Sequence, residues 1–204
     1  MLKLTFTNKS FPVATVLLFS MLLTQCSTTE NQRVGGLYNI DSLIENQINS
    51  LISHQAVISK KAILNNVEKI TTRAPKDSLE WGEELAVFLE LAVVNKPTNR
   101  ETYKVENYGD NESNLSVKSF TTTEDIPVKF LRIFYQKSLS NVRKIEAQYD
   151  EENSLYASTR FLTMEFENIK EATILTSYSV EGGQKMFLDD SVQYWIGANI
   201  ALKK

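Results

Sequence analysis

Three kinds of side chain in this sequence are able to do chemistry: the only cysteine, Cys26, the only histidine, His54, and several adjacent carboxylates. His54 has the chemistry of a general base, but no G-x-S-x-G motif supplies a nucleophile for it. One histidine and one cysteine are also too few ligands for a typical zinc site. We therefore expect no enzyme activity, no metal and no cofactor. We expect His54 to lie in the last turn of a helix, where the helix dipole favours a cation.

The carboxylates do not form a recognisable catalytic or calcium-binding pattern. Glu83 and Glu84 are neighbours on a predicted helix and point about 100° apart, so they cannot act as a pair. Glu80 and Glu84 share a face, which we expect to be the solvated side of that helix. Asp150–Asn153 and Asp189-Asp190 lack the spacing of a calcium-binding loop and are predicted to be solvated hairpin turns.

Aromatic and arginine side chains are the remaining candidates for a binding site. Side chains at i and i+2 share one face of a strand, which places Tyr156, Arg160 and Leu162 together. An arginine on a mostly apolar face suits an amphipathic ligand with an acidic head. The predicted groove, between helix and sheet, is lined by Trp81, Arg132, Tyr135, Tyr156, Arg160, Tyr178 and Trp195. The alternative is that these aromatics simply pack in the core, as is common in strands.

The charge balance argues against some partners. The chain has 22 basic and 25 acidic side chains, and two of the lysines, Lys3 and Lys9, precede Cys26. The remainder therefore has 20 basic against 25 acidic side chains, a formal charge of −5. This sign argues against nucleic acid and against electrostatic docking on an anionic lipid surface.

Residues 1–25 are predicted to be a signal peptide rather than part of the fold. Lys3 and Lys9 precede an apolar run, Phe11–Leu23, that spans about 20 Å as a helix, short of the roughly 30 Å of a bilayer core. The next residues, Leu23-Thr24-Gln25-Cys26, resemble the lipobox of bacterial lipoproteins, although the residue before the cysteine is usually Gly, Ala or Ser. The alternative is a secreted protein with a chance cysteine.

The lipobox resemblance implies that Cys26 carries acyl chains such as palmitate. Two or three long chains would make membrane attachment effectively permanent. The residue after the cysteine is Ser27 and not Asp, and the enterobacterial sorting rule would then imply the outer membrane. Only one acidic residue, Glu30, follows closely, which favours the periplasmic face over surface export.

The mature chain is predicted to be a flexible tether, residues 26–36, followed by one domain, residues 37–204. Apolar spacing predicts a first helix over 41–54 and a second from the capping residue Asp77 to Asn95-Lys96-Pro97. Residues 55–73 are either a hairpin turning at Asn65-Asn66, which we favour, or a continued helix.

From residue 101 the pattern changes to strands separated by turn signals. The predicted fold is α+β: an antiparallel β-sheet meander of about six to eight strands with two N-terminal helices packed on one face. We expect turns at Tyr108–Asn111, Asp150–Asn153 and Gly182-Gly183. The candidate strands are Thr102–Val105, Leu115–Phe120, Val128–Tyr135, Val142–Tyr149, Leu155–Phe166, Thr173–Val180, Lys185–Leu188 and Val192–Ile200.

Three short motifs resemble lipoproteins of Bacteroidetes-type bacteria. They are Trp81-Gly82-Glu83-Glu84-Leu85 with Phe88 and Lys96-Pro97, then Asn153-x-Leu155-Tyr156, then Tyr178-x-x-Glu181-Gly182-x-Gln184-Lys185. The resemblance implies the envelope compartment and the fold layout, and it brings no activity with it. We expect a non-enzymatic binding protein for an apolar or amphipathic, lipid-like ligand. The alternatives are a subunit that docks another envelope protein and, far behind, a hydrolase.

Overall fold

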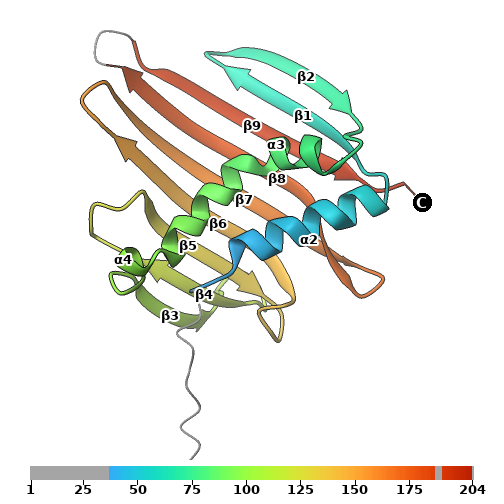
Figure 1. The fold of residues 1–204 in the computed structure, drawn as a ribbon, viewed down its shortest axis with the longest axis horizontal. Helices are drawn as coiled ribbons and strands as arrows, with labels where there is room; N and C mark the ends of the chain where they lie inside the picture. Colours follow the sequence, from blue (N-terminus) through green and yellow to red (C-terminus); the bar gives the residue numbers. More distant parts are fainter. Residues whose placement is uncertain (1–36, 187–189, 204) are drawn as a thin grey trace, which may run out of the picture. The chain divides into compact units, whose positions relative to one another are not determined.

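The computed structural model describes residues 37–186 and 190–203, which form an α+β domain built on one antiparallel sheet. The predicted signal peptide, Cys26 and the tether lie outside the described residues, as does Asp189. The sheet has nine strands in the order β2-β1-β9-β8-β7-β6-β5-β4-β3 (Figure 1). The predicted meander is confirmed, because β3 to β9 pair in chain order. The strand number is higher than the predicted six to eight, because residues 57–73 add a hairpin at the far edge to a meander of seven strands. The strands predicted at Thr173–Val180 and from Lys185 are one strand, and the described residues hold four helical segments and not two, because the second predicted helix breaks at Leu89 and Lys96.

The elements follow the chain in the order helix, hairpin, helices, meander. The helical segments are α2 (Ile40–Ser53), α3 (Ser78–Leu89), the 3-10 helix η1 (Glu90–Asn95) and the single turn α4 (Pro97–Arg100). The strands are β1 (Val57–Leu64), β2 (Val67–Arg73), β3 (Lys104–Gly109), β4 (Ser116–Thr121), β5 (Val128–Tyr135), β6 (Val142–Glu152), β7 (Tyr156–Ile169), β8 (Ala172–Met186) and β9 (Val192–Ala201).

The hairpin favoured for residues 55–73 is confirmed. β1 and β2 pair antiparallel with Leu64 opposite Val67. Both turn residues adopt positive φ, 45° at Asn65 and 68° at Asn66, as a two-residue hairpin turn requires. The Asn65 side chain also accepts a hydrogen bond from the backbone N–H of Gln193, which ties the turn to β9.

Side-chain caps fix where the two long helices begin. Asn39 accepts a hydrogen bond from the backbone N–H of Ser42, and Asp77 accepts one from that of Glu80. The Glu80 carboxylate accepts in turn from the backbone N–H of Lys76, so Asp77 and Glu80 form a variant of the capping box, in which the third helical residue bonds back across the N-cap.

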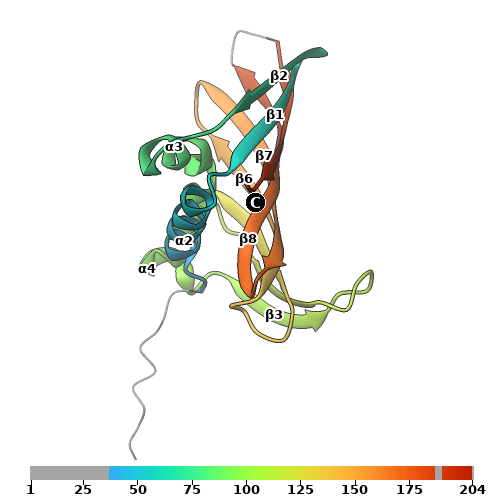
Figure 2. The ribbon, with the colours of Figure 1, turned by 90° about the vertical axis from the view of Figure 1, so that its right-hand side faces the viewer.

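The helices cover only one face of the sheet. Figure 2 shows α2, α3 and α4 on one side of the strands, and no helix or strand of the described residues lies over the other side. The core lies between helices and sheet and includes Trp81, Leu85 and Phe88 of α3, with Tyr178 of β8. Because strand side chains alternate between faces, every strand has one row of residues on the face away from the helices, called here the open face.

Two turn predictions are wrong. Gly182-Gly183 lies inside β8, and Asp150 to Glu152 lie inside β6. Gly182 serves packing and not turning: a Cβ there would lie 2.4 Å from the Thr159 carbonyl oxygen and 2.9 Å from the Tyr194 hydroxyl. The absence of a side chain therefore lets Tyr194 lie against the strand.

The turn geometry predicts opposite effects for two substitutions at Asn66. Asn66→Ala should lower the free energy of unfolding by about 1 kcal/mol, because a Cβ without local hydrogen bonding disfavours positive φ. Asn66→Gly should leave stability unchanged or slightly raised, since it creates the preferred Asn-Gly turn. Urea unfolding measures both; equal losses in the two variants would contradict this turn.

Candidate functional site

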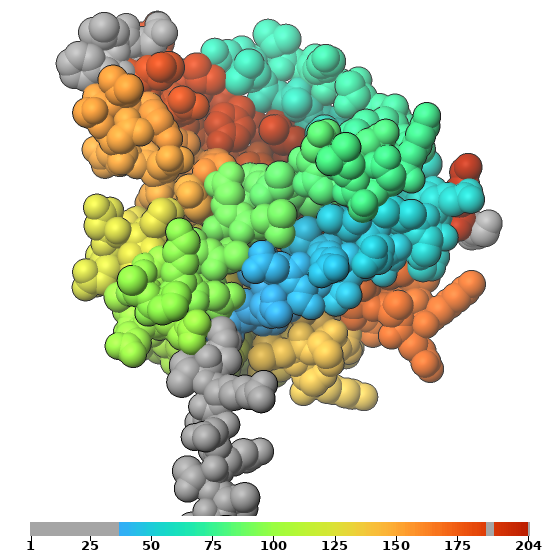
Figure 3. Space-filling view, viewed as in Figure 1, coloured from blue at the N-terminus to red at the C-terminus, as the bar shows by residue number. Residues whose placement is uncertain are grey.

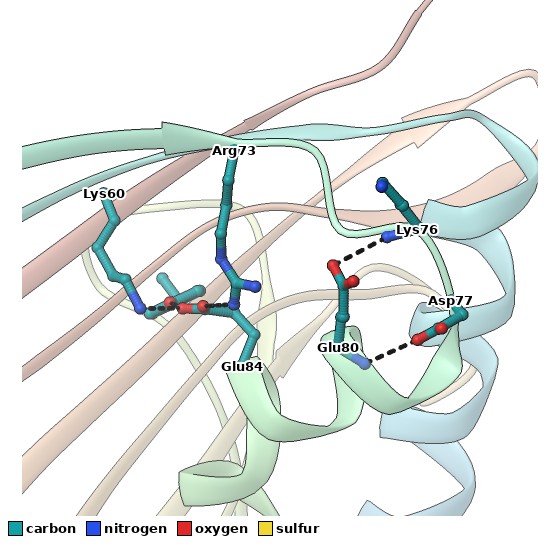
Figure 4. Close-up of polar contacts among 7 residues, drawn as sticks. Lys60, Arg73, Lys76, Asp77, Glu80 and Glu84 are labelled. Atoms are coloured by element: carbon teal, nitrogen blue, oxygen red, sulfur yellow. Dashed lines mark hydrogen bonds and ion pairs between the residues drawn. The ribbon is translucent and has the colours of Figure 1, made fainter.

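The most concentrated group of charges in the described residues surrounds the buried carboxylate of Glu84. Its side chain is only 2% exposed. Lys60 Nζ of β1 lies 2.6 Å from one carboxylate oxygen, and the Arg73 guanidinium at the end of β2 donates to the other (Figure 4). The Tyr178 hydroxyl of β8 also donates to Glu84. One helix side chain therefore joins three strands.

The surroundings of Glu84 keep it charged. Burial raises the pKa of its carboxyl, but hydrogen bonds from Lys60, Tyr178 and Arg73 together lower that pKa more, so it lies below its usual value of 4.5. Burial and the hydrogen bond to Glu84 raise the pKa of the Tyr178 hydroxyl above 10. The Tyr178 hydroxyl therefore stays protonated at neutral pH and remains a hydrogen-bond donor to Glu84.

This cluster is an anchor for the helix layer. The Glu84 carboxylate is engaged by three donors and covered by protein, which leaves it no free side for a substrate. The Phe88 ring packs edge-on against the Tyr178 ring of the cluster, with ring centroids 5.3 Å apart. The expectation that Glu84 lies on a solvated helix face is therefore wrong, because its cations come from distant strands.

A second ionic contact lies further along the same helical segment. Arg160 of β7, 17% exposed at its side chain, donates to Glu90 at 2.7 Å and stacks its guanidinium over the Tyr149 ring at 4.4 Å. A depression of about 490 Å³ surrounds it and is also lined by Tyr156 and Tyr194. The acid partner for Arg160 is thus supplied by the protein, which disfavours capture of an acidic ligand head there.

The open face carries an elongated groove. Three adjoining depressions of about 470, 290 and 440 Å³ share lining residues: Trp195 belongs to the first two, and Glu181 and Gln193 belong to the last two. The groove runs along β9 from Asn199 to Gln193, a length of roughly 20 Å at 3.4 Å per residue.

The end of the Trp195 side chain lies over a glycine, two residues further along the same strand. A Cβ on Gly197 would lie 2.1 Å from the end of the Trp195 indole, so the ring occupies the space that a side chain would fill. The end of the indole thus packs on the strand. Sequence reasoning named Trp195 but missed Gly197, although the Trp-x-Gly spacing on one strand face was available as a signal.

The structure distributes the predicted groove residues over five places. Trp81 and Tyr178 are buried in the core, as the packing alternative predicted. Tyr156 and Arg160 come together on the helix side of the sheet. Arg132 contacts Glu146 at 3.9 Å and lies over Phe130, Trp195 lines the open-face groove, and Tyr135 is half-buried at the end of β5. One groove lined by all seven residues therefore does not form.

The remaining candidates of the sequence have local roles. His54 caps the C-terminus of α2, as expected, and its Nδ1 lies 2.7 Å from the Ser50 carbonyl oxygen. Among the described residues there is no group of three or more His, Cys, Asp or Glu side chains able to hold a metal ion. The helices of residues 37–186 and 190–203 are all too short or too polar to cross a bilayer.

The view of the helix side shows how much of the sheet remains bare on that side too. In Figure 3, α2 and α3 cover the middle of the sheet, while parts of the β6–β9 strands are visible beyond them at the upper left.

Comparison of the chain with models of known families, with curated proteins and with solved structures finds no match.

The anchor role of Glu84 predicts a large and local stability effect. Glu84→Ala should lower the free energy of unfolding by about 2–3 kcal/mol, less than for a fully buried pair, because Lys60 and Arg73 are 32% and 43% exposed and can rehydrate. Glu83→Ala, on the exposed side of the same helix, should change it by less than about 0.5 kcal/mol. Equal effects of the two variants in urea unfolding would refute the anchor.

The same carboxylate predicts a pH dependence. Its pKa is lower in the folded than in the unfolded chain, so its contribution is present above about pH 4.5 and is lost as the pH falls through the folded-state value. The stability difference between the wild type and Glu84→Gln should therefore shrink between pH 6 and pH 3. A difference that stays constant over this range would show that the charge of Glu84 does not contribute.

Proposed function

We propose that this chain is a lipoprotein of the bacterial cell envelope whose domain binds an amphipathic ligand on the open face of its sheet, without catalysing a reaction. The observation that carries the binding role is the uncovered groove around Trp195. A large aromatic side chain that is accessible from a groove is a common anchor of recognition surfaces. The envelope location rests on the lipobox-like Leu23-Thr24-Gln25-Cys26.

The anchor and the tether explain how such a domain would work. Acyl chains on Cys26 would hold the protein on a membrane, in our proposal the periplasmic side of the outer membrane. Residues 27–36 would let the domain move up to roughly 35 Å from the bilayer. A ligand or an envelope partner within that distance is then met at high local concentration.

The ligand contact is proposed for the open face and not for the space between helices and sheet. That space is filled by side chains with almost no exposure, including Trp81, Phe88 and Leu131. A lipid chain there would need to displace a packed core. The open face needs no such rearrangement, because no described element covers it (Figure 2).

The contacts of the titratable groups support binding over hydrolysis. Glu84 and Arg160 are engaged in anchoring the helices, and His54 bonds to the end of its own helix. None of these groups is next to a nucleophile and a cleft at the same time, which hydrolysis would require.

A second candidate function, docking of another envelope protein, is favoured by the β1–β2 hairpin. Val67 and Ile70 of the edge strand β2 are 71% and 63% exposed, and Leu64 lies opposite Val67. An edge strand has unpaired backbone groups that can pair with a partner strand, and its exposed Val67 and Ile70 would add apolar contact on either face. Val67→Glu should abolish such an association and leave ligand binding at Trp195 intact.

The lipid anchor predicts metabolic labelling that depends on one residue. Cells that express the wild type and are fed labelled palmitate should yield a labelled, membrane-bound protein. Cys26→Ala should abolish the label and release the protein from membranes, because the thioether can no longer form. Equal labelling of both proteins would contradict the assignment.

The binding role predicts that amphipathic ligands change the fluorescence of Trp195. Residues 27–204 would be titrated with laurate and with soluble oligosaccharides, each in the wild type and in Trp195→Phe. At least one class should shift the emission in the wild type and not in the variant, because Trp81 is buried. If no class shifts the wild-type emission, the open-face binding role is wrong.

A further inference from the structure

The groove around Trp195 has the chemistry of a polyol-binding surface, and this point rests on the proposed binding role. Its part of about 470 Å³ is lined by Trp195, Ile70, Tyr178, Gly197 and Ala198, by two charged side chains, and by short hydroxyl and amide side chains. The hydroxyl and amide residues are Ser59, Thr163, Ser177, Ser179 and Asn199. These groups both donate and accept hydrogen bonds, as the hydroxyls of a sugar do.

From these contacts we infer that the groove binds a neutral oligosaccharide, with one sugar ring stacked on Trp195. A sugar ring has an apolar face of C–H groups, and the negative face of an indole attracts such weakly positive hydrogens. The end of the Trp195 indole lies over Gly197, and the residue lines the depressions on both sides of it, so the ring is accessible from the groove. Contact with the strand restricts the ring, which lowers the side-chain entropy lost on binding.

The polar groups beside the indole are in part already oriented. The Ser177 hydroxyl donates to one oxygen of Glu165 at 2.7 Å, which fixes that carboxylate and leaves its second oxygen as an acceptor. Asn199 faces Ser59 and Ser177 across the strand pairs. A carboxylate held by a serine, with an amide on the neighbouring strand, is suited to adjacent hydroxyls of one sugar.

The charge of the groove selects against acidic ligands. Five carboxylates and two lysines line its three parts, and Lys61 is already paired with Glu68 at 2.8 Å. The carboxylates are Asp150, Glu151, Glu152, Glu165 and Glu181. A phosphate or uronic acid group would be repelled, whereas neutral hydroxyls can donate to the carboxylates and exchange hydrogen bonds with the hydroxyl and amide side chains.

The position of the groove disfavours a peptide as its occupant. It lies over β6, β7, β8, β9 and β1, each of which is paired on both sides, and it reaches the edge strand β2 only at Ile70. Their backbone groups are therefore used within the sheet, and a peptide could not add a strand there. Recognition must depend on side chains alone, which suits an extended glycan in an elongated groove.

The experiment uses the full chain reconstituted in phosphatidylcholine vesicles and neutral tetrasaccharides built from hexose or N-acetylhexosamine. Isothermal titration calorimetry should detect binding by the wild type. Trp195→Ala should weaken it at least tenfold. Gly197→Ala keeps every lining side chain but should weaken binding severalfold, because the new Cβ displaces the indole.

Two matched controls locate the site. Tyr108→Ala removes an exposed aromatic of β3 and should keep the affinity within twofold. Asn46→Ala alters a separate depression of about 700 Å³ beside α2 and should also have no effect. Loss of binding in Asn46→Ala but not in Trp195→Ala would overturn the inference, and so would equal affinity for a tetrasaccharide of uronic acids.

The outcomes separate this inference from the proposed function. If no neutral tetrasaccharide binds but laurate shifts the emission of Trp195, the ligand class is wrong and the open-face binding role stands. If neither binds, both are wrong. Circular dichroism of each variant confirms folding, and the pair Gly197→Ala and Tyr108→Ala keeps the test informative even if Trp195→Ala is unstable.

Discussion

The buried carboxylate of Glu84 is the constraint on which the arrangement of this domain depends. A single layer of helices on a nine-stranded sheet needs more than apolar contact to fix how the helices are oriented on the strands, because apolar packing is non-directional. Glu84 supplies the direction by joining α3 to β1, β2 and β8 at once. Glu90, at the start of η1, forms a second ion pair between the helical segments and the sheet, with Arg160 of β7. The two contacts hold the helices across one face and tie the edge hairpin to the same layer.

This anchoring makes the two faces of the sheet chemically different. The helix side is dominated by Leu, Ile, Phe and Trp side chains with almost no exposure. The open face alternates charged pairs such as Lys144 with Glu146 and hydroxyl residues such as Ser177 and Ser179, with Trp195 among them. The polar groups keep the uncovered face soluble, and the aromatic gives it one point of strong contact. We regard this asymmetry as the basis of the proposed binding role.

Local features of the fold were predictable from the sequence, because local physics determines them. The Asn65-Asn66 turn needs residues that tolerate positive φ, and the N-caps Asn39 and Asp77 satisfy the first backbone donors of their helices; of the two caps, the sequence reasoning named only Asp77. Gly182-Gly183 misled the prediction, since a glycine pair signals a turn equally well as a close approach. Here Gly182 makes room for Tyr194 of the neighbouring strand, a contact that depends on strand pairing.

The candidate site was less predictable, because its contacts join distant residues. Lys60 and Arg73 lie 24 and 11 residues from Glu84, and Tyr178 lies 94 residues from it, so the carboxylate looked solvated in a helical pattern. Trp195 was named in the sequence, but its neighbours Ser59, Ser177 and Asn199 come from three strands and have no motif. Only the sheet order brings them together.

The central claim is that the helices protect one face of the sheet and leave the other free. It is tested most directly by acrylamide quenching of two single-tryptophan variants, Trp81→Phe, which retains Trp195, and Trp195→Phe, which retains Trp81. The account predicts that Trp195 is quenched severalfold more strongly than Trp81, which is 0% exposed. Equal quenching of both residues, or stronger quenching of Trp81, would contradict it.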